Sequence, residues 1–191
     1  MYVSTAPQTL PVTNAAAAGI KAFYFHDIDN HNLEVIYFPK GKGNEKWQEP
    51  NGKIFLGIDY TAIGISNTES SLQFFQSIPG IERKGESFNW VTEQERLNNV
   101  KGASLLITWL CTAAGSGIEF LQCLKPCAGM PYPADTRADD IWYWQNNFIY
   151  NRCDSIVQQI KKAGYNFVFK EIVHLKNSKA FIVKDKLVMQ C

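Results

Sequence analysis

The chain has 191 residues, of which 46% are hydrophobic and 19% charged, and its formal net charge is +1. Its length predicts one domain, or two small modules that share a core. The near-neutral charge, without a basic run, gives no electrostatic support for nucleic-acid binding. No apolar run approaches the roughly 20 residues that a membrane-spanning helix needs. We therefore expect neither nucleic acid nor a membrane as a partner.

The first 39 residues combine an arm with a pair of strands. Residues 1–20 are rich in Pro, Thr and Ala and predict an arm. "KAFYFHD" (21–27) and "NLEVIYFP" (32–39) are dominated by aromatic and β-branched residues, which favours two strands joined by a turn at "DIDN". Residues 40–54 are polar, contain several Gly and Pro, and predict a linker.

A complete β-α-β-β-β unit follows. "FLGIDYTAIGI" (55–65) predicts a strand, and residues 66–78 predict a helix because Leu72, Phe75 and Ile78 recur at helical spacing after a run of cap-forming residues. Residues 80–90 predict the next strand, and 91–102 predict a loop or short helix. The apolar run 103–113 and the segment 115–124 predict the last two strands.

The same order of elements recurs after a proline-containing connection. Residues 140–150 predict a strand, 151–164 a helix, and 165–175, 179–185 and 186–191 three strands. The expected organisation is an arm (1–20), a strand pair of an upstream module with its linker (21–54), a first module (55–128) and a second module (140–191).

Five cysteines, at positions 111, 123, 127, 153 and 191, form no C-x-x-C motif. We expect reduced thiols in a cytoplasmic protein. The first residues lack a basic segment followed by a continuous apolar one, so no signal peptide is expected.

The order of these segments and the residues in them resemble the vicinal oxygen chelate superfamily, which includes glyoxalase I, bleomycin-resistance proteins and extradiol dioxygenases. "FHDIDNHNLEVIYFP" resembles its strand-ending signature, and "FLGIDYTAIGISNTESSLQFFQSIPGIE" its opening strand and helix. "GIEFLQCLKP" resembles a module end, and "ADDIWYWQ" the opening of a second module. The resemblance implies an α+β fold of paired βαβββ modules, forming a curved mixed sheet around a pocket, with an extra N-terminal strand pair.

In that superfamily a metal is held by the first and last strands of two modules. Carried over by position, the ligands are Tyr60, Glu119, Tyr143 and Gln190, and Glu119 alone matches the usual residue type. A phenol is protonated at neutral pH and is a poor metal ligand. We therefore expect no bound metal, with Fe, Zn or Mn as the alternative cofactor.

The candidate catalytic residues are Glu119, Tyr60 and Tyr143, which the resemblance implies meet across the pocket. A carboxylate between two phenols can recognise a polar molecule or act in acid–base chemistry. The candidate ligand-binding residues are Tyr60, Arg96, Asn98, Trp109, Tyr132, Arg137, Tyr143 and Gln190.

His31 and Glu34 match the strand-ending signature, but the opening strand that should face Glu34 is missing from the chain. We expect a structural role for this strand pair, and a site completed by another subunit is the alternative, which makes a homodimer possible.

Three functions stay open. The preferred hypothesis is a small-molecule-binding protein with a degenerate metal site. The alternatives are a metal-dependent glyoxalase-like lyase or extradiol-type dioxygenase with unusual ligands, and a structural or subunit-association module.

Overall fold

The computed structural model describes residues 3–49, 52–78, 80–112, 116–126, 129–131, 133–141, 143–169 and 172–185, and the backbone of 189–190. Its strands are β1 (Gln8–Thr9), β2 (Lys21–His26), β3 (Asn32–Tyr37), β4 (Tyr60–Ile65), β5 (Glu82–Asn89), β6 (Ser104–Cys111), β7 (Gly117–Lys125), β8 (Met130–Pro131), β9 (Val173–His174), β10 (Lys179–Ala180) and β11 (Met189–Gln190). Its helices are α1 (Thr68–Gln76), α2 (Thr92–Asn98) and α3 (Cys153–Lys162), with a short 3-10 helix at Glu45–Trp47. The α+β fold class is confirmed.

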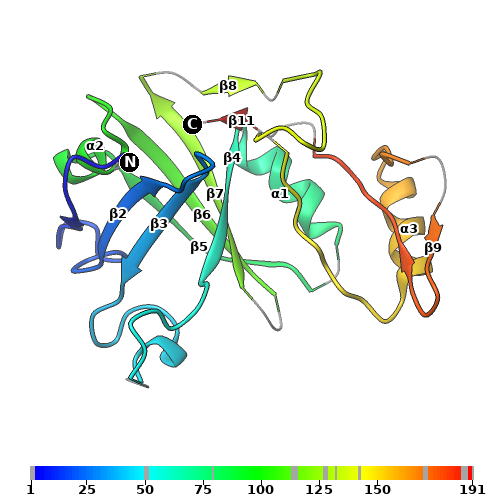
Figure 1. Cartoon of the computed structure of the whole chain (residues 1–191), viewed down its shortest axis with the longest axis horizontal. Helices are drawn as coiled ribbons and strands as arrows, with labels where there is room; N and C mark the ends of the chain where they lie inside the picture. The colour runs from blue at the N-terminus through cyan, green and yellow to red at the C-terminus, as the bar shows by residue number, and fades with distance from the viewer. Residues whose placement is uncertain are drawn as a thin grey trace.

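The first module forms a four-stranded sheet in the order β4-β7-β6-β5. β4 and β7 are parallel, whereas β5, β6 and β7 are antiparallel neighbours. α1 covers one face of this sheet, and the N-terminal hairpin stands opposite its other face (Figure 1). The sheet therefore has a core face and a face that looks toward the hairpin.

The core lies between α1 and the sheet. Phe120 on β7 is fully buried, and its ring packs edge-on against Phe75 of α1 with ring centroids 5.0 Å apart. Phe74 contacts Tyr165 at 4.8 Å between centroids, which ties the segment after α3 to α1. The alternation of strand side chains explains why Ile118 and Phe120 are buried here while Glu119 points to the opposite face.

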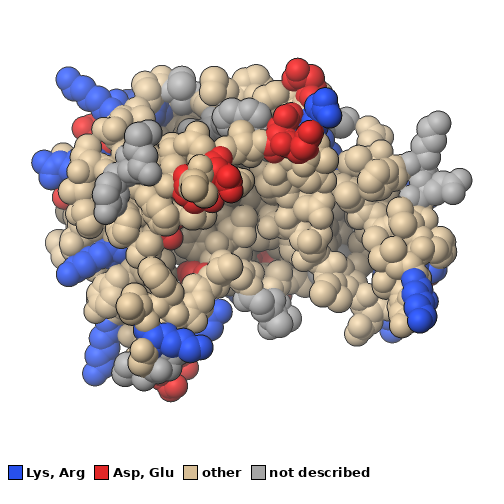
Figure 2. All heavy atoms as spheres, viewed as in Figure 1, with Lys and Arg blue, Asp and Glu red and all other residues tan. Residues whose placement is uncertain are grey.

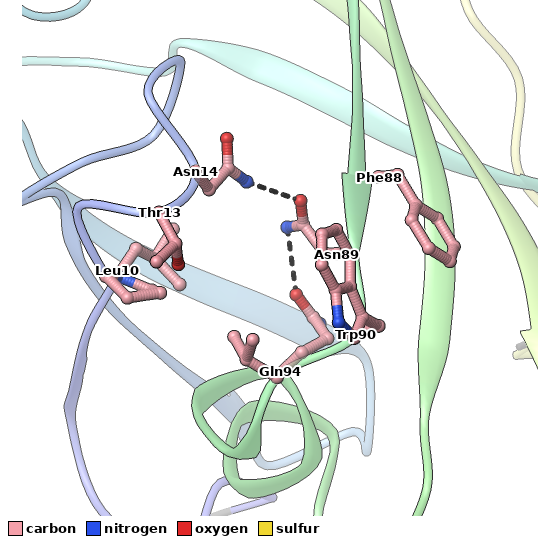
Figure 3. Close-up of a pocket in the computed structure, with 9 residues that line it drawn as sticks. Leu10, Thr13, Asn14, Phe88, Asn89, Trp90 and Gln94 are labelled. Carbon is pink, nitrogen blue, oxygen red and sulfur yellow. Dashed lines mark hydrogen bonds between the residues drawn. The ribbon is translucent and has the colours of Figure 1, made fainter.

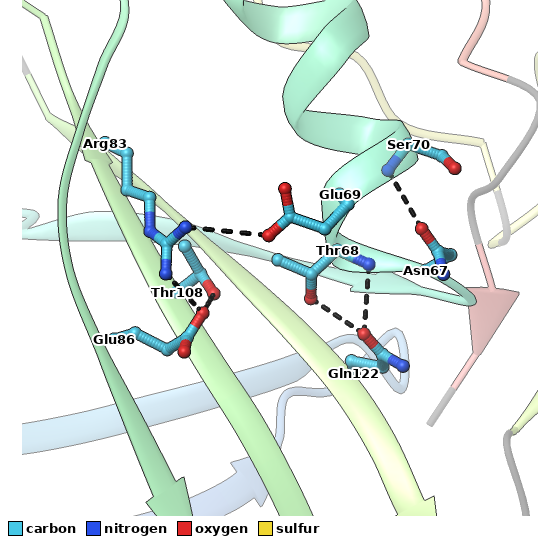
Figure 4. A network of polar contacts seen from close by, with 8 residues as sticks. All are labelled: Asn67, Thr68, Glu69, Ser70, Arg83, Glu86, Thr108 and Gln122. Atoms are coloured by element: carbon cyan, nitrogen blue, oxygen red, sulfur yellow. Dashed lines mark hydrogen bonds and ion pairs between the residues drawn. The ribbon is translucent and has the colours of Figure 1, made fainter.

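The start of α1 is held by a cap and by β7. The Asn67 side chain accepts a hydrogen bond from the Ser70 amide at 2.9 Å. Gln122 Oε1 accepts from both the amide and the hydroxyl of Thr68, at 2.9 and 2.8 Å (Figure 4). These bonds satisfy amides that have no partner within the helix.

We expect Asn67→Ala to lower the free energy of unfolding by about 1 kcal/mol, because the cap is lost while the core is kept. Urea denaturation measures this change. Asn44→Ala is a matched control, because Asn44 caps only the short helix at Glu45–Trp47. An equal loss of stability in both variants would contradict the assigned importance of the α1 cap.

The N-terminal strands form a separate antiparallel sheet, β1-β2-β3. The β2–β3 turn is organised by Asp27, whose Oδ1 accepts from the amides of Asp29 and His31 at 2.9 and 2.8 Å. Asn30 takes the left-handed backbone conformation with φ +73°. The predicted strand pair is confirmed, and its register places Tyr24 opposite Glu34.

The second module differs from its expected form. α3 matches the predicted helix, but 143–150 forms neither a strand nor a helix. Among the described residues, the later strands form only short pairs, β9 with β10 and β8 with β11. Val168, Phe169 and Leu175 remain about half exposed, and Tyr165 and Val183 are only partly buried against the core, so these segments lack the continuous buried face that stabilises a sheet.

Cys123 is disulfide-bonded, and Cys111 and Cys153 are free. The expectation of reduced thiols is therefore wrong for Cys123. No helix in the described part of the chain has both the length and the apolar character needed to cross a membrane.

Candidate functional site

Two glutamates from different sheets converge in the hollow between the hairpin and the four-stranded sheet. Glu34 lies on β3 and Glu119 on β7, and the charge of Glu34 contributes to raising the pKa of Glu119. Figure 2 shows the molecule hollowed between the hairpin and β4, with acidic atoms inside the hollow. Both side chains keep part of their surface accessible.

Tyr60, the first residue of β4, connects the two glutamates. Its hydroxyl donates a hydrogen bond to Glu34 Oε2, and it is also hydrogen-bonded to Glu119. The parallel register of β4 and β7 sets Tyr60 beside Gly117, two residues before Glu119 along the strand. Because side chains two apart on a strand share a face, Tyr60 and Glu119 point the same way.

Enclosure by the protein makes both carboxylates weak acids. Burial raises the pKa of Glu34 to about 7, the Tyr60 hydrogen bond opposes this, and the charge of Asp59 adds to it. Burial, followed by the charges of Glu34 and Asp59, raises the pKa of Glu119 to about 8. The pair therefore holds protons near neutral pH, or requires a positive charge or hydrogen-bond donor between its members.

Two tyrosines line the hollow beside the carboxylates. Burial, then the charges of Glu119 and Glu34, raise the pKa of Tyr60 well above its ordinary value. Tyr24 on β2 behaves likewise: burial raises its pKa most, followed by Glu34 and Glu119. Both phenols are therefore neutral hydroxyl groups at any physiological pH.

Trp109 and Asp59 complete the surroundings. Trp109 on β6 is opposite Glu119 in the sheet register. A Cβ at Gly85 would lie 2.5 Å from the Trp109 ring, so only glycine lets the indole cross β5 there. Trp47 Nε1 donates to Asp59 Oδ1 at 2.5 Å, which holds this third carboxylate in place directly before β4.

The structure brings together only part of the expected catalytic set. Tyr60 and Glu119 meet as expected. Tyr143 does not join them: it is 41% exposed, and its hydroxyl donates to Gln145 at 3.0 Å. Instead, Glu34 of the N-terminal strand pair accepts the hydrogen bond of Tyr60.

The other candidate residues lie in different settings. Arg96 is exposed on α2, and Asn98 accepts a hydrogen bond from Gln94. Arg137 is exposed and pairs with Asp139 at 3.1 Å. Gln190 lies on β11, beside β4, and its side chain, like Tyr132, lies outside the described residues.

Sequence reasoning did not place Tyr24 or Asp59 in the site, and it assigned Glu34 to a structural strand pair or to a site completed by another subunit. For Glu34 a signal existed, since it belongs to the strand-ending signature. Tyr24 follows from the hairpin register, which a turn at 27–30 already implied. The missing information was which sheet the hairpin faces.

Two further polar features lie outside this hollow. Asp27, Asp29 and His31 form an exposed group at the hairpin turn, in which His31 Nδ1 lies 3.0 Å from Asp27. A small pocket lies beside α2. The residues that line it include Leu10, Thr13, Asn14, Phe88, Asn89, Trp90 and Gln94 (Figure 3).

Comparison with known proteins supports the fold. No family model and no curated protein matches the sequence. Among solved structures, a glyoxalase family protein from Bacillus cereus is similar, with a TM-score of 0.56 and 22% identity, over 70% of this chain and 89% of that one. At this identity the likeness shows the fold alone: the protein has a glyoxalase-like α+β fold.

Proposed function

We propose that the protein binds a small polar molecule in the hollow lined by Glu34, Tyr60 and Glu119. The observation that carries this proposal is the convergence of two carboxylates from different sheets on one phenol. Burying two carboxylates close together costs free energy, and a ligand that donates hydrogen bonds or carries positive charge offsets that cost. The hollow between the hairpin and β4 supports the proposal, because it leaves room for a molecule beside acidic side chains (Figure 2).

A second candidate is a lyase or dioxygenase activity dependent on a divalent cation. The position of Glu34 favours this candidate, because its carboxylate and that of Glu119 together offer a cation two anionic ligands. The donor set of Glu34, Glu119 and Tyr60 consists of oxygens, which suits Mn²⁺ better than Zn²⁺. In that case the two carboxylates would hold the cation, which would supply a Lewis acid, and Tyr60 would orient Glu34.

Thermal-shift measurements at pH 7, with a library of amines, polyols and hydroxy acids, test the proposal. A ligand at one hundred times its Kd is expected to raise Tm by roughly 5–10 °C. We expect the shift to disappear in Glu34→Gln and Glu119→Gln. Glu82→Gln is the matched control, because Glu82 is exposed and paired with Lys84 at 2.7 Å.

The same screen with and without Mn²⁺ separates the two candidates. Binding that needs no metal supports the first, and binding that requires Mn²⁺ and both glutamates supports the second. A chain that is stabilised by neither the library nor Mn²⁺ would overturn both and leave a structural role.

A further inference from the structure

The strand registers show which side chains face the hollow. Side chains two apart on a strand share a face, so Tyr60 and Ala62 of β4 lie on the face of Glu119, which stands beside Ala62 in the parallel register. Trp109 of β6 is directly opposite Glu119 and lies on that face too. From the other sheet, Glu34 accepts the hydrogen bond of Tyr60. The hollow therefore has carboxylates from two sheets and an aromatic ring beside one of them.

Both glutamates have uncharged strand neighbours. On the four-stranded sheet, the described neighbours of Glu119 on its own face are Ala62, Trp109, Gly117 and Leu121. On the hairpin, the described neighbours of Glu34 on its own face are Tyr24, Asn32 and Ile36. None of these side chains is a cation, so neither carboxylate has an opposite charge beside it on its own sheet.

The basic residues of the two sheets are placed elsewhere. Arg83 and Lys84 lie on the edge strand β5, and each pairs with a glutamate at 2.7 Å. Lys21 is the first residue of β2, and Lys125 is the last residue of β7. His26, at the end of β2, is hydrogen-bonded within the hairpin at 2.7 Å. In the view of Figure 2, acidic atoms lie inside the hollow and basic atoms lie around it. A bound molecule with a positive charge would supply the charge that the neighbouring strand positions lack.

Trp109 adds an apolar surface next to Glu119. A Cβ at Gly85 would lie 2.5, 2.7 and 2.9 Å from three indole atoms, so the ring rests against β5. The Trp109 side chain remains partly exposed, and together with Leu121 it packs on the apolar cluster that includes Ile107. An aromatic face attracts a cation, and apolar side chains favour the burial of a hydrocarbon group. This combination suits a cation that carries an apolar substituent.

We propose that the ligand of the hollow is an organic ammonium ion, a protonated primary amine with an aromatic or aliphatic substituent. Its three N–H donors can bridge the carboxylates of Glu34 and Glu119, and its substituent lies against Trp109. A polyol carries no charge, and the two glutamates repel a carboxylic acid in its ionised form. The inference rests on the proposed function, because it names the ligand class of the same hollow.

Three probes of similar shape test the charge of the ligand: phenethylamine, phenethyl alcohol and phenylacetate. Their binding is measured by isothermal titration calorimetry at pH 8.5, where an aliphatic amine is protonated, with a chelator present to exclude divalent cations. We expect phenethylamine to bind at least about tenfold more tightly than phenethyl alcohol, because its hydrogen bonds are charge-assisted, and we expect phenylacetate not to bind. Equal affinities for the amine and the alcohol, or tighter binding of phenylacetate, would overturn the inference.

Variants locate the two halves of the probe. Glu34→Gln and Glu119→Gln each remove one anionic partner, so we expect each to weaken the binding of phenethylamine about tenfold and to leave that of phenethyl alcohol unchanged. Trp109→Leu is expected to weaken the binding of phenethylamine but not that of ethylamine. Trp90→Leu is the matched control, because Trp90 lines the pocket beside α2. Unchanged amine affinity in both glutamate variants would place the amine outside the hollow and overturn the inference.

If Trp109→Leu does not fold, the parent protein still tests the apolar half of the site. Ethylamine binding as tightly as phenethylamine would mean that the substituent has no site there, which overturns the assigned ligand class.

The outcomes also separate this inference from the proposed function. If polyols or hydroxy acids stabilise the parent protein but neither glutamate variant, while phenethylamine and ethylamine do not bind, the proposed function holds and the ammonium assignment fails. If no molecule of any class binds, both fail.

Discussion

We expect Glu119→Gln to be more stable than the parent protein at pH 9 and equally stable at pH 5. The ordinary pKa of both glutamates is 4.5, and the folded values are about 7 for Glu34 and about 8 for Glu119. Between pH 4.5 and 8 the folded state therefore holds protons that the unfolded chain has released. Stability then falls as pH rises through this window, and the full penalty is present above both folded values.

Removing one carboxylate removes most of that penalty. Glutamine at position 119 has the shape of a protonated glutamate and carries no charge, which also allows Glu34 to ionise more easily. The gain at pH 9 is on the order of 2–4 kcal/mol, because solvent reaches the hollow and screens part of the repulsion. Thermal denaturation from pH 5 to pH 9 without divalent cations measures it.

Glu82→Gln provides the comparison, since it removes one exposed carboxylate whose pKa is lowered, first by the hydrogen bond from Lys84. We expect its stability to follow the pH profile of the parent protein. If the profile of Glu119→Gln also ran parallel to that of the parent, the two glutamates would not face each other in solution.

Phe120→Ala is expected to have the largest effect on stability. Phe120 is fully buried next to Phe75, and deleting its ring leaves a cavity between α1 and the sheet. The expected loss in the free energy of unfolding is about 3–5 kcal/mol, measured by urea denaturation. Substitution of the adjacent residue, Glu119→Gln, is expected to raise stability at high pH instead, because Glu119 lies on the other face of β7.

Phe88→Ala is the matched control for ring removal. Phe88 is 45% exposed on β5 and stacks on Trp90 with centroids 4.8 Å apart. Its loss is expected to cost less than about 1 kcal/mol. Comparable losses in the two variants would contradict the placement of the core between α1 and the sheet.

The sequence by itself determined the local elements of the first module and of the N-terminal hairpin. The helical spacing of Leu72 and Phe75, the run of cap-forming residues before them and the apolar run of β6 depend on interactions between near neighbours, so they can be recognised without the fold. Tyr60 and Glu119 were identified differently, by carrying positions over from the family that the order of segments resembles.

Only the tertiary structure decided which side chains Glu119 meets. The sequence repeat pointed to Tyr143 in the second module, yet Glu34 on the hairpin is the partner, and Tyr143 lies at the surface. The pairing of two sheets depends on which apolar faces are buried together, and that choice involves the whole chain rather than any one segment. The second module illustrates the same limit: its strand-like composition did not produce a four-stranded sheet among the described residues, because only single side chains such as Tyr165 and Val183 pack on the core while Val168, Phe169 and Leu175 stay about half exposed.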